Sequence, residues 1–373
     1  MTELEQAIHA IEHGLLKVTR SNKRPAKKME LIQRMKYYKV PGFSATFVHQ
    51  EEMAWAKGFG VVEAGSEKPV TNETIFQAAS ISKPFTAMIA LHLVEAGSLD
   101  LDADANEFLH SWKIPKSKYT QAGPDGAHPK VTLRGLLSHT AGMNIFGYPG
   151  YPSGSELPTL QQILKGKPPA TSKPVRVVKP PGTAFKYSGG GYLVVQQMIE
   201  DVTGRPLAVL AKELIFDKLG MASSTFDSKL PQDYITRAAT AHNKTGEPIP
   251  GKWHLYPEQT AASLWSTPSD LACLIIEILK SLKNESNLVL SAEMTRQMLT
   301  PQIGMGGVGF NIVIKDGMTR FGHPGVNEGF HNMIIGCPET GQGIVWMTNG
   351  ENGRRLGQEV SRGLAEVVRF SWW

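Results

Sequence analysis

The chain concentrates its strand-like segments at its two ends, and this distribution limits the folds it can adopt. Residues 43–48 and 53–58 alternate around a short turn and predict two paired strands. Three apolar runs bounded by turns predict further strands near the C-terminus, at residues 309–314, 333–337 and 343–347. Helical spacing predicts helices at residues 3–16, 29–37 and 354–369. We therefore expect an antiparallel sheet built from both ends of the chain and flanked by the terminal helices.

The middle of the chain, from about Leu99 to Gly251, has a different character. It is rich in Pro and Gly and holds short helical segments, such as residues 133–137 and 190–202. The sequence therefore predicts an α+β fold in which the antiparallel sheet carries a mostly helical inserted domain. The expected divisions are a helical arm at residues 1–28, a sheet domain at residues 29–105 and 255–373, and a mostly helical domain at residues 106–254.

Composition narrows the class of protein. The 373 residues are 41% hydrophobic, as in a globular chain with a large core. The formal charge of +5 is modest, and we interpret the basic segment from Lys17 to Lys28 as a solvated arm rather than a nucleic-acid-binding one. Neither a signal peptide nor a membrane span is visible, so we expect a cytoplasmic chain. Two distant cysteines and scattered histidines predict no metal and no cofactor, and self-association is left open.

The pair Ser80 and Lys83 is the strongest chemical signal. It is the only Ser-x-x-Lys in the sequence, and it lies where a strand at residues 74–78 hands over to a helix at residues 81–96. Positions i and i+3 share a helix face, so the lysine can reach the serine hydroxyl and act as its base. The alternative is a serine that caps the helix beside a solvated lysine. The motif by itself leaves both interpretations open.

Two later segments add candidate site residues. Tyr187 precedes Gly189 at the start of the helix at residues 190–202, and a tyrosine beside lysines can act as a general base. His323 and Gly325 stand in a glycine-rich segment, where the histidine can position a substrate carboxylate or shuttle a proton. Glu328 follows closely, and we expect it to disfavour anionic substrates.

Ser80-x-x-Lys83, Tyr187-Ser-Gly189 and His323-x-Gly325, in this order, resemble the three active-site motifs of the serine β-lactamase and penicillin-binding-protein superfamily. The segments at residues 131–142 and 263–272 are similar to class C-type members, and the likeness runs from about Val40 to the C-terminus. The resemblance implies that Ser80 is acylated and that Lys83 and Tyr187 share the base and acid roles. It also implies an oxyanion hole formed by the backbone N–H groups of Ser80 and Val326.

Two departures from the family pattern direct the functional prediction. Gly189 stands where β-lactamases and peptidases usually carry an asparagine that holds the substrate amide, and His323 stands where β-lactamases carry lysine. The His-x-Gly form resembles D-peptidases and family VIII-type carboxylesterases. We therefore predict a serine hydrolase acting on small esters, with weak β-lactam hydrolysis left open. The alternatives are a D-alanyl-D-alanine carboxypeptidase or D-aminopeptidase, an acyltransferase, and a non-catalytic scaffold. We interpret His139 as structural.

Overall fold

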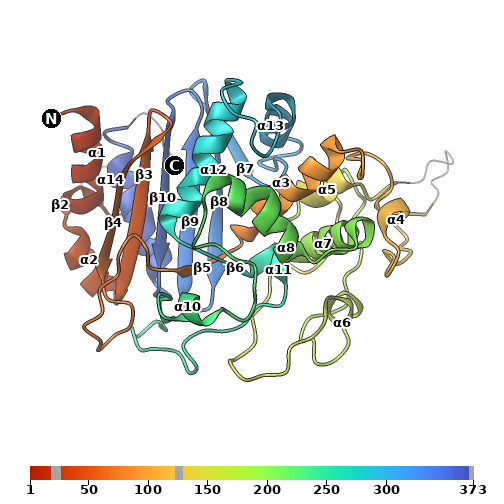
Figure 1. Cartoon of the computed structure of the whole chain (residues 1–373), viewed down its shortest axis with the longest axis horizontal. Helices are drawn as coiled ribbons and strands as arrows, with labels where there is room; N and C mark the ends of the chain where they lie inside the picture. Colours follow the sequence, from red (N-terminus) through yellow and green to blue (C-terminus); the bar gives the residue numbers. More distant parts are fainter. Residues whose placement is uncertain (18–26, 122–128, 369–373) are drawn as a thin grey trace.

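The computed structural model of the chain describes residues 1–17, 27–121 and 129–368. Its centre is a six-stranded antiparallel sheet with strand order β4-β3-β10-β9-β8-β7, drawn from both ends of the chain (Figure 1). The strands are β3 (Gly42–His49), β4 (Glu52–Gly60), β7 (Asn311–Lys315), β8 (Met318–Asn327), β9 (Phe330–Cys337) and β10 (Gln342–Thr348). Two short pairs stand apart, β1 (Leu15–Leu16) with β2 (Lys28–Met29) and β5 (Phe76–Ala79) with β6 (Leu264–Ser266).

Helices cover both faces of the sheet, which explains why its two central strands are buried along their whole length. Every residue of β9 and β10 is buried, whereas β4, at the sheet edge, is largely exposed or half-buried. The terminal helices pack on one face: α1 (Glu3–His13), α2 (Leu31–Tyr38) and α14 (Gly353–Leu364). On the other face α12 (Pro268–Leu282) contacts β3, β9 and β10 and is followed by α13 (Ala292–Leu299).

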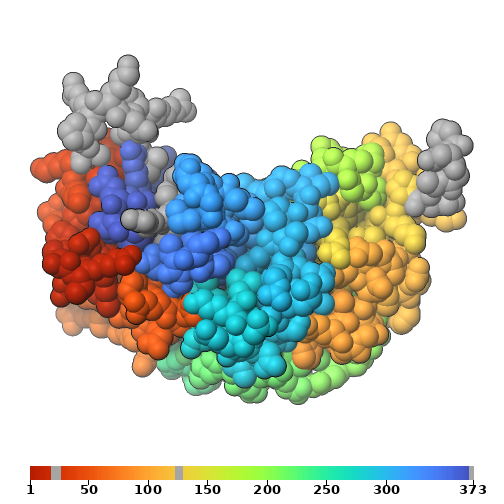
Figure 2. All heavy atoms as spheres, turned by 90° about the horizontal axis from the view of Figure 1, so that it is seen from above, coloured from red at the N-terminus to blue at the C-terminus, as the bar shows by residue number. Residues whose placement is uncertain are grey.

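The middle of the chain forms a second, mostly helical part beside the sheet. Figure 2 shows the C-terminal segments, in blue, lying between the red N-terminal segments and the yellow and green middle. The helix α3 runs into this part and is buried on nearly every side. Its helices are α3 (Ser82–Glu95), α4 (Ala105–Phe108), α5 (Leu133–Leu137), α6 (Leu160–Lys165), α7 (Gly189–Thr203), α8 (Leu207–Ala211), the π-helix η1 (Lys212–Phe216), α9 (Asp217–Leu219), α10 (Gln232–Ile235) and α11 (Gln259–Ala262).

The predicted α+β fold, with an antiparallel sheet flanked by the terminal helices, is confirmed. The prediction misses one strand of the six-stranded sheet, because residues 322–330 read as a glycine-rich motif, and it also misses the short strands β1, β2 and β6. Residues 322–330 belong largely to β8, whose glycines and proline weaken the usual strand pattern. The domain boundaries stay a prediction, and most of the basic segment from Lys17 to Lys28 lies outside the described residues. No helix within the described ranges is long and apolar enough to cross a membrane.

Candidate active site

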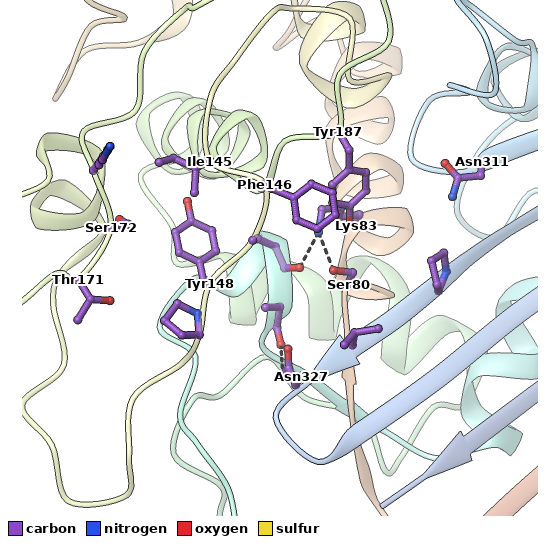
Figure 3. Close-up of a pocket in the computed structure, with 18 of the residues that line it drawn as sticks. Ser80, Lys83, Ile145, Phe146, Tyr148, Thr171, Ser172, Tyr187, Asn311 and Asn327 are labelled. Atoms are coloured by element: carbon purple, nitrogen blue, oxygen red, sulfur yellow. Dashed lines mark hydrogen bonds between the residues drawn. The ribbon is translucent and has the colours of Figure 1, made fainter. Parts of the chain in front are cut away.

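Ser80 lies in a sharp turn between β5 and α3. The residue before it, Ala79, adopts a left-handed backbone with φ of 55°, a conformation that costs a residue with a side chain of order 1–3 kcal/mol. The register of β5 against β6 also shifts between Gln77 and Ala79. The chain therefore leaves the strand abruptly, and Ser80 reaches the wall of a pocket before α3 begins (Figure 3).

Lys83 is buried, so the alternative of a solvated lysine is wrong. Its side chain is 1% exposed, and Nζ donates hydrogen bonds to Ser80 Oγ at 3.0 Å and to the carbonyl oxygen of Ala261 at 2.8 Å. Both contacts appear as dashed lines in Figure 3. Burial lowers the pKa of Lys83 to about 7, because the charged ammonium loses its hydration. The lysine is thus partly neutral near neutral pH.

Tyr187 lies against the same lysine. Its ring centroid is 5.0 Å from Lys83 Nζ, and the ring of His139 packs on it with centroids 4.3 Å apart. Burial raises the pKa of Tyr187, and a hydrogen bond with Ser80 opposes that rise. The next residue, Ser188, caps α7 by accepting a hydrogen bond from Gly191 N–H at 3.0 Å. In the resting site the phenol is therefore protonated, and Lys83 is the group closer to acting as a base.

The third predicted segment runs along β8. His323 is 1% exposed, and its Nδ1 donates to the carbonyl oxygen of Pro324 at 2.6 Å. Its Nε2 is buried and has no hydrogen-bond partner among the residues that the structure describes. Burial, followed by the positive charge of Lys83, lowers the pKa of His323 to about 3, so the imidazole is neutral. A Cβ at Gly325 would stand 2.1 Å from the carbonyl oxygen of Ala78. Only glycine lets β8 pass this close to the end of β5.

The segments that carry Ser80, Tyr187 and Val326 all line one pocket of about 780 Å³. Of the predicted site residues, it brings together Ser80, Lys83, Tyr187, Gly189 and Val326. Its other lining residues are Ile145, Phe146, Gly147, Tyr148, Pro149, Thr171, Ser172, Lys173, Phe185, Ala261, Ala262, Met305, Asn311, Pro324 and Asn327. Three large apolar side chains at the pocket are solvent-exposed, Phe146 by 75%, Val326 by 51% and Met305 by 43%. The pocket therefore offers an apolar surface beside the Ser80 hydroxyl.

Comparison with known proteins assigns the family. Residues 30–369 match the family model described as Beta-lactamase. The chain belongs to the Beta-lactamase family. Esterase EstB of Burkholderia gladioli is 27% identical over 228 residues, 58% of this chain and 54% of the esterase. Penicillin-binding protein 4 of Amycolatopsis lactamdurans is 25% identical over 330 residues, 83% of this chain and 81% of that protein. The structure of an octameric penicillin-binding protein homologue from Pyrococcus abyssi matches with a TM-score of 0.71 and 25% identity, covering 91% of this chain and 76% of that one.

Membership of the Beta-lactamase family confirms the predicted resemblance. At the level of the family it also confirms the prediction of an enzyme related to serine hydrolases, because the relatives include an esterase and penicillin-binding proteins. The chain spans about half the length of the first curated relatives it matches, 41% of one and 54% of the other. The particular reaction must therefore be argued from the site.

The space beside Gly189 is occupied in this Beta-lactamase family member. A Cβ built at Gly189 would lie 3.1 Å from the ring of Tyr148 and 3.3 Å from the carbonyl oxygen of Phe146. Both residues belong to the segment at residues 145–149, which passes in front of α7 and lines the pocket. Both distances are shorter than ordinary van der Waals contacts, so a side chain at position 189 would require this segment to move by a few tenths of an ångström. The glycine at position 189 therefore suits the course of residues 145–149.

Three predicted residues lie outside the pocket lining. His323 and Gly325 stand behind it, one beside Lys83 and the other against β5. Glu328 is exposed in the turn after β8, where its backbone N–H donates to the hydroxyl of Tyr256 at 3.0 Å. The effect of Glu328 on charge selectivity stays a prediction.

Sequence reasoning missed the partners supplied by distant segments. The carbonyl oxygen of Ala261 holds Lys83, and the segment at residues 145–149 shapes the pocket. The residue types do not reveal either role. Ala261 acts through its backbone carbonyl, and residues 145–149 act through the space that they fill. The interpretation of His139 as structural stays a prediction. In the part of the chain that the structure describes, no group of three or more His, Cys, Asp or Glu is placed to hold a metal ion.

Proposed function

We propose that this chain hydrolyses carboxylic esters through an acyl-enzyme on Ser80. The observation that carries the proposal is the 3.0 Å contact between Ser80 Oγ and the Nζ of a buried Lys83 whose pKa is lowered to about 7. A serine hydroxyl is a weak nucleophile unless a nearby base takes its proton. A lysine that is partly neutral at neutral pH is such a base.

In the proposed acylation, Ser80 Oγ attacks the ester carbonyl carbon while its proton passes to neutral Lys83. The oxyanion would be held by the backbone N–H groups of Ser80 and Val326, a pair of donors worth several kcal/mol of barrier. Tyr187 then gives its phenolic proton to the departing alkoxide and regains a proton from the Lys83 ammonium. The products of this half-reaction are the free alcohol and the Ser80 ester.

In the proposed deacylation, water replaces the alcohol and the steps run in reverse order. Tyr187, coupled to Lys83, takes a proton from the water as its oxygen attacks the acyl carbon. The tetrahedral intermediate collapses, Ser80 Oγ leaves and recovers its proton, and the carboxylic acid departs. One ester bond is broken, one water is consumed, and both Lys83 and Tyr187 return to their starting states.

The residues at positions 323 and 189 support an ester as the substrate, although Lys173 adds a basic side chain to the pocket lining. His323 is neutral and lies behind the wall, so it supplies no positive charge for a substrate carboxylate. Gly189 has no side chain to hold a substrate amide. The exposed apolar side chains of Phe146, Met305 and Val326 suit an apolar acyl or alcohol group. These features weigh against a carboxypeptidase and against efficient β-lactam hydrolysis.

The test compares p-nitrophenyl esters, D-alanine p-nitroanilide and nitrocefin as substrates for the wild-type chain and for Ser80→Ala. We expect turnover of the esters by the wild type, at least a hundredfold more slowly by Ser80→Ala. Mass spectrometry after a fluorophosphonate probe should place the adduct on Ser80. Preferred cleavage of the anilide would favour the D-aminopeptidase, and ester product formed on added alcohol would favour the acyltransferase.

Ser155→Ala is the matched control, since Ser155 is exposed and lies outside the pocket lining. It should leave ester turnover and probe labelling unchanged. Equal turnover by the wild type and Ser80→Ala would remove the esterase proposal. An inert wild type that the probe does not label would favour the scaffold alternative.

We also propose that the chain self-associates. The support is the structural likeness to the octameric homologue from Pyrococcus abyssi. Light scattering coupled to size-exclusion chromatography measures the mass directly. A mass of one chain, 40.8 kDa, across a hundredfold range of protein concentration would exclude self-association.

A further inference from the structure

His139 holds the backbone on both sides of Tyr187. Its carbonyl oxygen accepts a hydrogen bond from the N–H of Lys186 at 2.7 Å, and its Nδ1 accepts one from the N–H of Ser188 at 3.1 Å. Lys186 and Ser188 are the two neighbours of Tyr187 in the sequence. One residue therefore fixes the peptide groups that set the direction of the tyrosine side chain.

The imidazole of His139 also packs against the phenol itself. Its centroid lies 4.3 Å from that of Tyr187, 5.2 Å from that of Tyr192 and 5.7 Å from that of Phe185. Tyr187 also contacts the rings of Phe146 and His323, with centroids 5.0 and 5.9 Å away. Of the three rings packed against the phenol, that of His139 is the nearest.

The backbone of His139 adopts an unfavourable conformation. Its φ is 61°, in the left-handed region that few residues with side chains adopt, and its side chain is only 6% exposed. Such a conformation persists only where the surrounding structure enforces it. Here it follows directly on α5 and turns the imidazole under the Tyr187 segment.

The contacts also define the proton state of the ring. An Nδ1 that accepts from a backbone N–H carries no proton, so the proton is on Nε2. Burial, followed by the positive charge of Lys83, lowers the pKa of His139 well below 6.5. The ring is therefore neutral when Lys83 begins to deprotonate, and the Ser188 contact is present over the working range of the site.

We propose that His139 is a positioning residue for Tyr187, holding the phenol in line with Ser80 through the Ser188 N–H contact and the packing of the two tilted rings. The inference rests on the proposed role of Tyr187 in the acyl-enzyme chemistry. His139 is not itself a lining residue of the pocket, but it packs against two that are, Tyr187 and Phe185. It acts through another residue, so its removal should slow the chemical step without weakening substrate binding.

The test is a double-mutant cycle on single-turnover acylation by a p-nitrophenyl ester. His139→Phe keeps an aromatic ring but removes the Nδ1 acceptor. We expect it to slow acylation about a hundredfold in the wild-type background, as a misplaced catalytic group does, with KM changed less than about threefold. In the Tyr187→Phe background the same substitution should cost less than about threefold, because groups that act as one unit are not additive.

A rescue variant separates positioning from folding. His139→Asn places a shorter acceptor on a residue type that tolerates the left-handed conformation, and it should recover at least about tenfold of the lost rate. Thermal unfolding of each variant is measured alongside. His110→Phe is the control, because His110 is exposed and remote from the pocket lining, and its rates should match the wild type.

The outcomes are distinct. If His139→Phe costs the same factor with and without the Tyr187 hydroxyl, or if the rates follow the melting temperatures alone, the positioning role is wrong while the esterase proposal stands. If Tyr187→Phe alone keeps the wild-type rate, the catalytic role of Tyr187 fails, and the inference about His139 fails with it. If His139→Phe does not fold, the cycle is run with His139→Asn against Tyr187→Phe, and additive costs then overturn the inference.

Discussion

Replacing Lys83 by methionine should make the protein more stable at pH 6 and leave its stability nearly unchanged at pH 9. The reason is the cost of burying an amine. The pKa of Lys83 is lowered from 10.5 to about 7 in the folded state, so between these values the unfolded chain binds a proton that the folded chain does not. The stability of the wild type therefore rises with pH across that window.

The size of the effect follows from the shift. At 1.36 kcal/mol per pKa unit, the buried amine costs about 5 kcal/mol at pH 6 and about 2 kcal/mol at pH 9. Methionine removes this cost and also the two hydrogen bonds to Ser80 Oγ and the carbonyl oxygen of Ala261, worth about 1 kcal/mol each. The net gain is about 3 kcal/mol at pH 6 and about zero at pH 9.

The assay is urea unfolding of the wild type and Lys83→Met at both pH values, with the slope of the transition checked for constancy. Lys165→Met is the control, because Lys165 is exposed on α6 and should add no pH dependence. A gain that is the same at pH 6 and pH 9, or a loss at pH 6, would refute the argument that burial sets the lysine pKa. The gain should come with loss of esterase activity.

The remaining predictions concern catalysis and the pocket. For a neutral ester, kcat/KM should rise with pH through a midpoint near 7 as Lys83 loses its proton. A midpoint below pH 5 would show that a group other than Lys83 causes the rise. Gly325→Ala places a Cβ 2.1 Å from the carbonyl oxygen of Ala78 and should lower the free energy of unfolding by about 1–3 kcal/mol, which denaturant titration measures. Phe146→Ala should reduce kcat/KM about tenfold for aryl and long-chain esters but not for acetates, and an equal effect on both would place this ring outside the apolar subsite. Glu328→Gln, compared on neutral and anionic esters, tests the predicted bias against anions, and unchanged selectivity would exclude it.

The sequence predicted the parts of the site that depend on nearest neighbours. Ser80 and Lys83 are three residues apart across the turn that leads into α3, so their contact follows from the local course of the chain. The strands β3 and β4 and the helix α7 follow from local periodicity in the same way. The strand β8 does not, because the residues that let it pass beside β5, Pro324 and Gly325, are those that weaken a strand pattern.

What the sequence alone determined is therefore the chemistry on offer and the order of the motifs: a serine, a lysine and a tyrosine, with strands at both chain ends to form the sheet. What only the tertiary structure decided is the state of those groups. The burial that lowers the Lys83 pKa, the carbonyl oxygen of Ala261 that accepts a hydrogen bond from Lys83 Nζ and the imidazole of His139 beneath Tyr187 all come from segments far along the chain. A pKa and a ring orientation depend on desolvation and packing by such distant residues, which no local pattern encodes.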